Sequence, residues 1–102
     1  MEKDFDIVFV KPRRYEDCVK CVEHIKRDKI VHINLLDLDA KESQRILDYI
    51  SGAVYIKGGQ IENPGESIFC TIPKNKKYLF EYKTKSSEGY DEEEEIIPSY
   101  KK

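Results

Sequence analysis

The sequence predicts an α/β fold of the α+β sandwich kind, in which two helices pack on one face of a mixed five-stranded sheet. Residues 6–10 and 30–35 are rich in β-branched residues and have the composition of buried strands. After each of them, apolar residues recur every three or four positions, as on one face of an amphipathic helix. Three further strand-like segments complete the order β-α-β-α-β-β-β.

The chain has the length of one domain. It has 102 residues, a formal net charge of -2, and 39% hydrophobic and 37% charged residues, which suits a soluble protein with a modest core. This charge gives no reason to expect nucleic-acid binding, and no apolar run approaches the roughly 20 residues that cross a bilayer. Three cysteines, an odd number, favour a reducing cytoplasm over a disulfide framework.

The first helix is expected to begin near Tyr15, shortly after Pro12. Glu16 and Asp17 stand in its first turn, where acids favour a helix start. The apolar residues of this helix share one face, at spacings of three and four: Tyr15, Cys18, Val19, Val22 and Ile25.

The second helix has the clearest local signals. Asp39, followed three residues later by Glu42, forms an aspartate version of a capping box. Gly52 stands where a left-handed C-cap is expected, so this helix is predicted to end there. Its buried stripe is predicted to consist of Ser43, Ile46, Leu47 and Ile50.

The segment after the second helix contains glycines and a proline at positions typical of turns. Gly58 and Gly59 predict a tight hairpin, and Pro64 with Gly65 predicts a second turn. Residues 78–82 are a candidate for an additional edge strand. The strands around the two turns are expected over residues 53–57, 60–63 and 67–72.

One face of the predicted sheet is expected to be open, because two helices cannot cover both faces of five strands. Val54, Ile56 and Ile61 alternate within the predicted hairpin and have aromatic neighbours. They would make the open face apolar, and such a face can be buried against a partner. A homodimer is therefore expected.

Composition divides the chain into two parts. Residues 1–84 contain the predicted elements and form the domain. Residues 85–102 differ, because residues 88–95 contain six acids and no base. That composition is typical of a solvated linker or tail.

Cys18 and Cys21 form a C-x-x-C pair. Redox pairs of this spacing lie at a helix N-terminus, where the pKa of the thiol is lowered, whereas this pair is predicted to lie about one turn inside the helix. A zinc site would also need Cys70, His24 or His32 as ligands. A strong zinc signal would include a second close pair of ligands, and the sequence has none. We interpret the cysteines as structural and expect no metal and no cofactor; a small cysteine-based metal or redox protein stays an alternative.

The sequence contains no enzyme signature. Gly58 and Gly59 lack the lysine and hydroxyl of a phosphate-binding loop, and no serine lies in a nucleophile elbow. The acids near the second helix are explained by capping and by a solvated helix face: Asp37, Asp39, Glu42 and Asp48. A binding or scaffold role is expected, and a ligand-binding regulatory module of similar build is a further alternative.

The segment from Asn34 to Pro73 resembles the SepF family of cell-division proteins. The matching residues occur in register: Asn34 and Leu35, residues 45–55, Gly58 and Gly59, Ile68 and Phe69, and Pro73. The family usually has Phe where this chain has Tyr49. On this resemblance, residues 6–74 are identified as a SepF-like core.

The resemblance implies a non-enzymatic adaptor in the cytoplasm at the division site. SepF proteins are dimers, and some polymerise further; they bind the C-terminal tail of the tubulin-like protein FtsZ and link its filaments to the membrane. By matching position, the resemblance places Tyr49, Asn63 and Phe69 at the pocket for that tail. It places Gly52 in a segment of self-association, to which we add Val54 and Ile56.

Both ends of the chain bear on this resemblance. Full-length members carry an N-terminal membrane helix; because the core here begins almost at Met1, we expect that anchor to be trimmed or lacking, and membrane contact only through it. The C-terminus resembles the FtsZ tail itself: Ile97, Pro98 and Tyr100 follow the acidic run, although Glu95 replaces the usual apolar residue. Residues 96–102 are predicted to mimic that ligand; the alternative is an acidic tail without this role.

Overall fold

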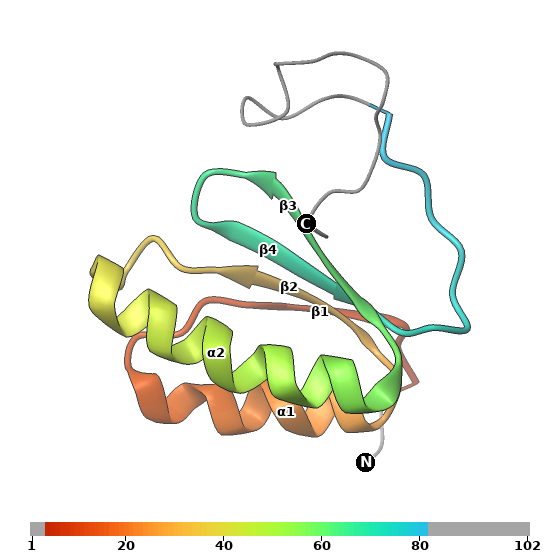
Figure 1. Cartoon of the computed structure of the whole chain (residues 1–102), viewed down its shortest axis with the longest axis horizontal. Coiled ribbons are helices and arrows are strands. Elements are labelled where there is room, and N and C mark those ends of the chain that lie inside the picture. The colour runs from red at the N-terminus through yellow and green to blue at the C-terminus, as the bar shows by residue number, and fades with distance from the viewer. Residues whose placement is uncertain (1–3, 82–102) are drawn as a thin grey trace.

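The computed structural model describes residues 4–81. Both helices lie on the same face of one sheet, so the molecule has two layers (Figure 1). The predicted α+β class with two helices is confirmed, whereas the predicted tail mimic (Ile97, Pro98 and Tyr100) lies outside the described residues. In chain order the elements are β1 (Ile7–Val10), the 3-10 turn η1 (Tyr15–Asp17), α1 (Cys18–Lys26), β2 (Ile30–Asn34), α2 (Ala40–Lys57), β3 (Gln60–Gly65) and β4 (Ile68–Ile72).

The sheet has four strands in the order β1-β2-β4-β3, so the prediction of five strands is wrong. β1 runs parallel to β2, and β4 is antiparallel to both of its neighbours. Residues 53–57, predicted as a strand, belong to α2, and residues 78–81 are not in a strand. The turn predicted at Pro64 and Gly65 is also wrong, because β3 continues through both with an irregular register after Glu62.

Helix α2 extends five residues beyond the predicted end at Gly52. Its buried residues are Ile46, Ile50 and Val54, which follow one another at intervals of four. The buried side of the helix therefore continues one turn beyond Ile50, the last residue of the predicted stripe. Gly52 lies on the outer side, where an added Cβ would meet nothing within 4 Å. A short apolar run such as residues 53–56 fits a strand or a helix equally well by local pattern, and the burial of Val54 favours the helix.

The glycine pair ends α2 instead of joining two strands. Gly58 is the C-cap and adopts a φ of 75°, in the left-handed region. Gly59 allows a close approach, because a Cβ there would lie 2.5 Å from the carbonyl oxygen of Ile72 on β4. The observed hairpin comes later, at Glu66 and Ser67, and Ser67 has a φ of 63°.

The core lies between the helices and the sheet. α1 begins at Cys18, after η1, rather than at Tyr15, and it buries Cys21 while Val19 is exposed, contrary to the predicted face. The predicted cap of α2 is confirmed, because the Asp39 carboxylate accepts a hydrogen bond of 2.8 Å from the N–H of Glu42. The buried cluster consists of Cys18, Cys21, Ile25, Val31, Ile33, Leu35, Ile46, Ile50 and Val54.

Two glycine substitutions are expected to change stability in opposite directions. Gly52→Ala should raise the free energy of unfolding by about 1 kcal/mol, because alanine has the higher helix propensity and the site is open. Gly59→Ala should lower it by about 1–3 kcal/mol, because its Cβ would press on the carbonyl of Ile72. Urea unfolding followed by circular dichroism measures both; an unchanged midpoint for Gly59→Ala would contradict the close contact with β4.

Candidate functional site

Tyr49 lies on the outer side of α2, next to η1. Its ring meets that of Tyr15 edge to face, with 6.2 Å between the centroids. The guanidinium of Arg45 lies 4.0 Å from the Tyr15 ring centroid, in a cation–π contact. Tyr49 is 47% exposed, so these three side chains form an accessible surface on which a ring or a proline could stack; we name it the Tyr49 surface (Tyr15, Arg45 and Tyr49).

An open groove of about 320 Å³, the charged groove, adjoins this surface and shares Tyr15 and Arg45 with it. Its charged lining consists of Arg13, Arg14, Arg45, Glu16, Asp37, Asp39 and Glu42. Exposed ion pairs join Asp37 to Lys11 at 3.8 Å and to Arg13 at 3.9 Å. Because both signs of charge are present, the groove suits a peptide with acidic and basic residues better than a bare anion.

From the sequence, Asp37, Asp39 and Glu42 are explained by capping and a solvated helix face, and no arginine is assigned to a site. The backbone N–H of Arg13 donates a hydrogen bond of 2.9 Å to the Asp17 carboxylate, which lowers the pKa of Asp17. This bond fixes the turn before η1. Arg13 and Arg14 are about thirty positions from Arg45 along the chain, so only the packing of η1 against α2 brings them together.

The other two residues assigned to the tail pocket lie on the β3–β4 hairpin. Asn63 is exposed on β3, at the edge of the sheet. Phe69 of β4 is half-buried on the helix-covered face, where it pairs with Ile33 and packs against the core. Within residues 4–81, no hydrogen bond or ring contact joins either of them to Tyr49.

The residues assigned to self-association lie on α2 rather than on a strand. Gly52 and Ile56 follow Tyr49 at spacings of three and four, so the three share one side of the helix, which we name the outer stripe (Tyr49, Gly52 and Ile56). Ile56 is 80% exposed. Val54 is buried in the core, so only Gly52 and Ile56 of the assigned set are accessible.

A second exposed apolar area is the sheet face opposite the helices. Phe9 of β1 is 67% exposed, and its ring centroid lies 4.9 Å from that of His32 on β2. Cys70 of β4 pairs with His32 in register, so the three side chains share this face. The Tyr78 hydroxyl hydrogen-bonds to two side chains of β3. None of the three residues predicted for the open face lies on it: Val54 and Ile56 belong to α2, and Ile61 of β3 pairs with Thr71 and packs against the core.

The C-x-x-C pair is buried. Cys18 is the first residue of α1, not one turn inside the helix as predicted, and Cys18 and Cys21 are each 1% exposed. Burial raises the pKa of Cys21 to about 11, with a further contribution from Cys18. Burial also raises the pKa values of Cys18 and Cys70. Reactive thiols need a lowered pKa and access, so the structure favours a packing role for this pair.

Residues 4–81 contain neither a cluster of metal-binding side chains nor a membrane-spanning helix. No three side chains of His, Cys, Asp or Glu gather there as they would around a metal ion. Neither helix within residues 4–81 has the length and apolar character that crossing a membrane requires.

The family model described as "Cell division protein SepF" matches residues 7–77, from β1 to just beyond β4. The chain belongs to the SepF family. The match covers more than half of the chain and nearly the whole described domain, which connects this protein with cell division.

Curated members of the SepF family are also similar to this chain. A cell division protein SepF from Shouchella clausii is 37% identical over 75 residues, which cover 74% of this chain and 48% of that protein. One from a Geobacillus species is 33% identical over 75 residues, with 52% of its length covered. One from Clostridium botulinum is 34% identical over 85 residues, with 57% covered. The chain thus spans about half the length of the relatives that it matches.

The thiols are expected to react slowly in the folded protein. At pH 8, Cys21 should react with Ellman's reagent at least about 100-fold more slowly than a free thiol, because its pKa is raised from 9.0 to about 11 and the sulfur is covered. Stopped-flow absorbance measures the rates, with a Cys21→Ser variant to assign the phases and denatured protein as the control for three accessible thiols. Rapid reaction of Cys21 at pH 8 would contradict the packing role.

Proposed function

We propose that this chain is the core of a non-enzymatic adaptor of cell division, which dimerises and binds the C-terminal tail of FtsZ. Family membership over residues 7–77 carries the proposal. In this role the adaptor acts in the cytoplasm at the division site. It would link FtsZ filaments to the membrane through an anchor outside the described residues.

The Tyr49 surface and the charged groove support peptide binding. Tyr49 and Tyr15 offer rings to an apolar, proline-containing segment, and Arg13, Arg14 and Arg45 offer cations to acidic residues of the same peptide. Phe69 and Asn63 remain part of the proposed pocket on the resemblance to the SepF family alone. Phe69 is packed against the core, so we assign it a supporting role under the binding surface.

The outer stripe supports self-association. Gly52 has no side chain and lies between Tyr49 and Ile56, so a second helix could approach α2 closely there. The open sheet face around Phe9 is the competing surface for a second copy. Because the outer stripe contains Tyr49, tail binding and self-association would share that residue of α2.

Tail binding can be tested on Tyr49. Tyr49→Ala should weaken the binding of a synthetic FtsZ tail peptide by about tenfold or more, because the exposed ring would no longer stack on the peptide. Isothermal titration calorimetry on the full chain measures the affinity. The matched control is Tyr55→Ala, because Tyr55 is 84% exposed but lies about 120° away around the same helix.

Further variants make this experiment decisive. Phe69→Leu keeps most of the buried volume and should weaken binding with little loss of fold. A chain that ends at Lys85 lacks the predicted mimic and should bind the added peptide more tightly if residues 96–102 dock on the site. Failure of the parent chain and of the truncated chain to bind the peptide would contradict the proposed function.

The dimer can be tested by placing a charge on each exposed apolar area. Ile56→Glu should convert the dimer to a monomer, because a carboxylate would be buried in the contact between two α2 helices. Phe9→Glu on the open sheet face should leave the dimer intact, and Val19→Glu on α1 is a control at another exposed apolar position. Sedimentation equilibrium measures the mass; a dimer lost only with Phe9→Glu would move the interface to the sheet, and a monomeric parent chain would contradict dimerisation.

A further inference from the structure

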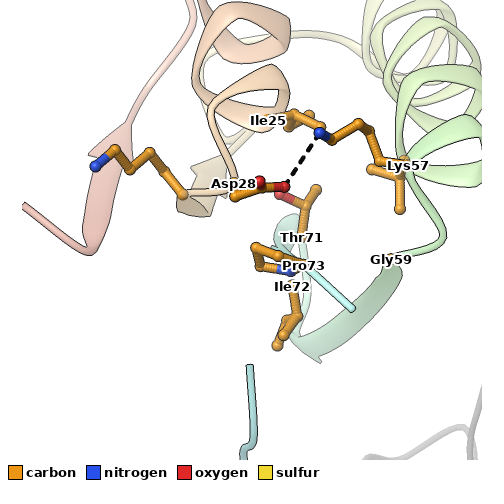
Figure 2. A pocket seen from close by; sticks show the side chains of 9 residues that line it. Ile25, Asp28, Lys57, Gly59, Thr71, Ile72 and Pro73 are labelled. Atoms are coloured by element: carbon orange, nitrogen blue, oxygen red, sulfur yellow. Dashed lines mark ion pairs between the residues drawn. The ribbon is translucent and has the colours of Figure 1, made fainter. Parts of the chain in front are cut away.

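The strongest unexplained feature lies at the end of the molecule where both helices stop. A cavity of about 10 Å³ lies there, lined by residues from the ends of α1 and α2 and from β4 (Figure 2). Ile25 and Val54 form part of its apolar wall. This volume is at the lower end of the roughly 10–15 Å³ that one water molecule needs, so nothing larger than a water fits.

Thr71 of β4 contributes a buried hydroxyl to this cavity. Its side chain is 2% exposed, and its Oγ1 atom has no hydrogen-bond partner within residues 4–81. In the sheet, Thr71 pairs with Val31 on one side and Ile61 on the other, and neither side chain can accept or donate a hydrogen bond. Buried hydroxyl groups are normally hydrogen-bonded, to protein or to an ordered water.

An ion pair faces this hydroxyl across the cavity. The Lys57 ammonium at the end of α2 lies 3.2 Å from the carboxylate of Asp28, which follows α1. Asp28 has a φ of 63°, in the left-handed region, and its N–H donates a hydrogen bond of 3.0 Å to the carbonyl of Ile25. Figure 2 shows the Asp28 carboxylate and the Thr71 side chain turned toward each other, without a direct hydrogen bond between them.

We propose that this cavity is a binding site for one structural water molecule, which bridges Thr71 to the Asp28–Lys57 pair. The water would donate to the Asp28 carboxylate and accept from the Thr71 hydroxyl or the Lys57 ammonium, which gives it the two to four polar partners that buried waters have. An ion is a poorer occupant, because Asp28 repels an anion and Lys57 repels a cation. The water ties β4 to the ends of both helices.

The test uses the full chain in solution. Nuclear magnetic resonance should detect a nuclear Overhauser effect from a long-lived water to the amide and methyl protons of Thr71. Thr71→Val removes the hydroxyl with little change in shape, so the water signal should disappear and the melting temperature should fall by about 4–8 °C. Thr71→Ser is the matched control, because it keeps the hydroxyl and should keep the water signal.

The opposite results are equally specific. Without a water, the Thr71 hydroxyl is unpaired in the core, and Thr71→Val should then leave the melting temperature unchanged or raise it. Either that result or the absence of a water signal in the parent chain would overturn the proposal. The parent measurement decides the question even if Thr71→Val fails to fold.

Discussion

The burial of one stripe of α2 is the constraint on which the rest of this structure depends. Ile46, Ile50 and Val54 are at most 5% exposed, and they belong to one cluster with Val31 and Ile33 of β2. Burial of each such side chain contributes roughly 1.5–3 kcal/mol, whereas a glycine inside a helix costs about 1 kcal/mol. The helix therefore continues through Gly52 and ends only after the last buried residue of the stripe.

The length of α2 then determines how the chain continues. The helix ends against β4, where the left-handed Gly58 turns the chain and Gly59 allows it to pass the carbonyl of Ile72. β3 begins at once and becomes the edge strand, so the hairpin comes after it rather than before it. The same geometry brings the ends of α1 and α2 together over Thr71, where Lys57 and Asp28 form their ion pair.

These constraints leave two exposed apolar areas on opposite sides of the domain, because α2 covers one face of the sheet and leaves the other open (Figure 1). The outer stripe adjoins the charged groove through Tyr49, Tyr15 and Arg45. The open face instead presents the ring of Phe9 beside His32. The outer stripe and the open face are therefore two separate places at which another chain could contact the domain. The two cysteines of α1, Cys18 and Cys21, face the core and therefore belong to neither area.

The sequence by itself determined the features that depend on neighbouring residues: the α+β class, the start of α2 at its Asp39 cap, the first two strands and the family resemblance. A cap is one local hydrogen bond, and a buried stripe is a local period, so both can be predicted without the tertiary structure. The C-terminal end of α2 could not be predicted from the sequence, because the local pattern of residues 53–56 fits a strand and a helix equally well. Only the burial of Val54 in the core distinguishes the two. That single difference removed the fifth strand and moved the hairpin to Ser67.

Some features of the candidate site could likewise be predicted from the sequence, and others depended on the tertiary structure. Tyr49 could be proposed from the sequence through the family resemblance, but the arginines beside it could not, because Arg13 and Arg14 reach the groove only through the packing of η1 on α2. Accessibility was also beyond the sequence: Val54 and Ile56 are two positions apart, yet one is in the core and the other is 80% exposed. On a helix, residues two apart lie on different sides, and only the tertiary structure decided that this segment is a helix.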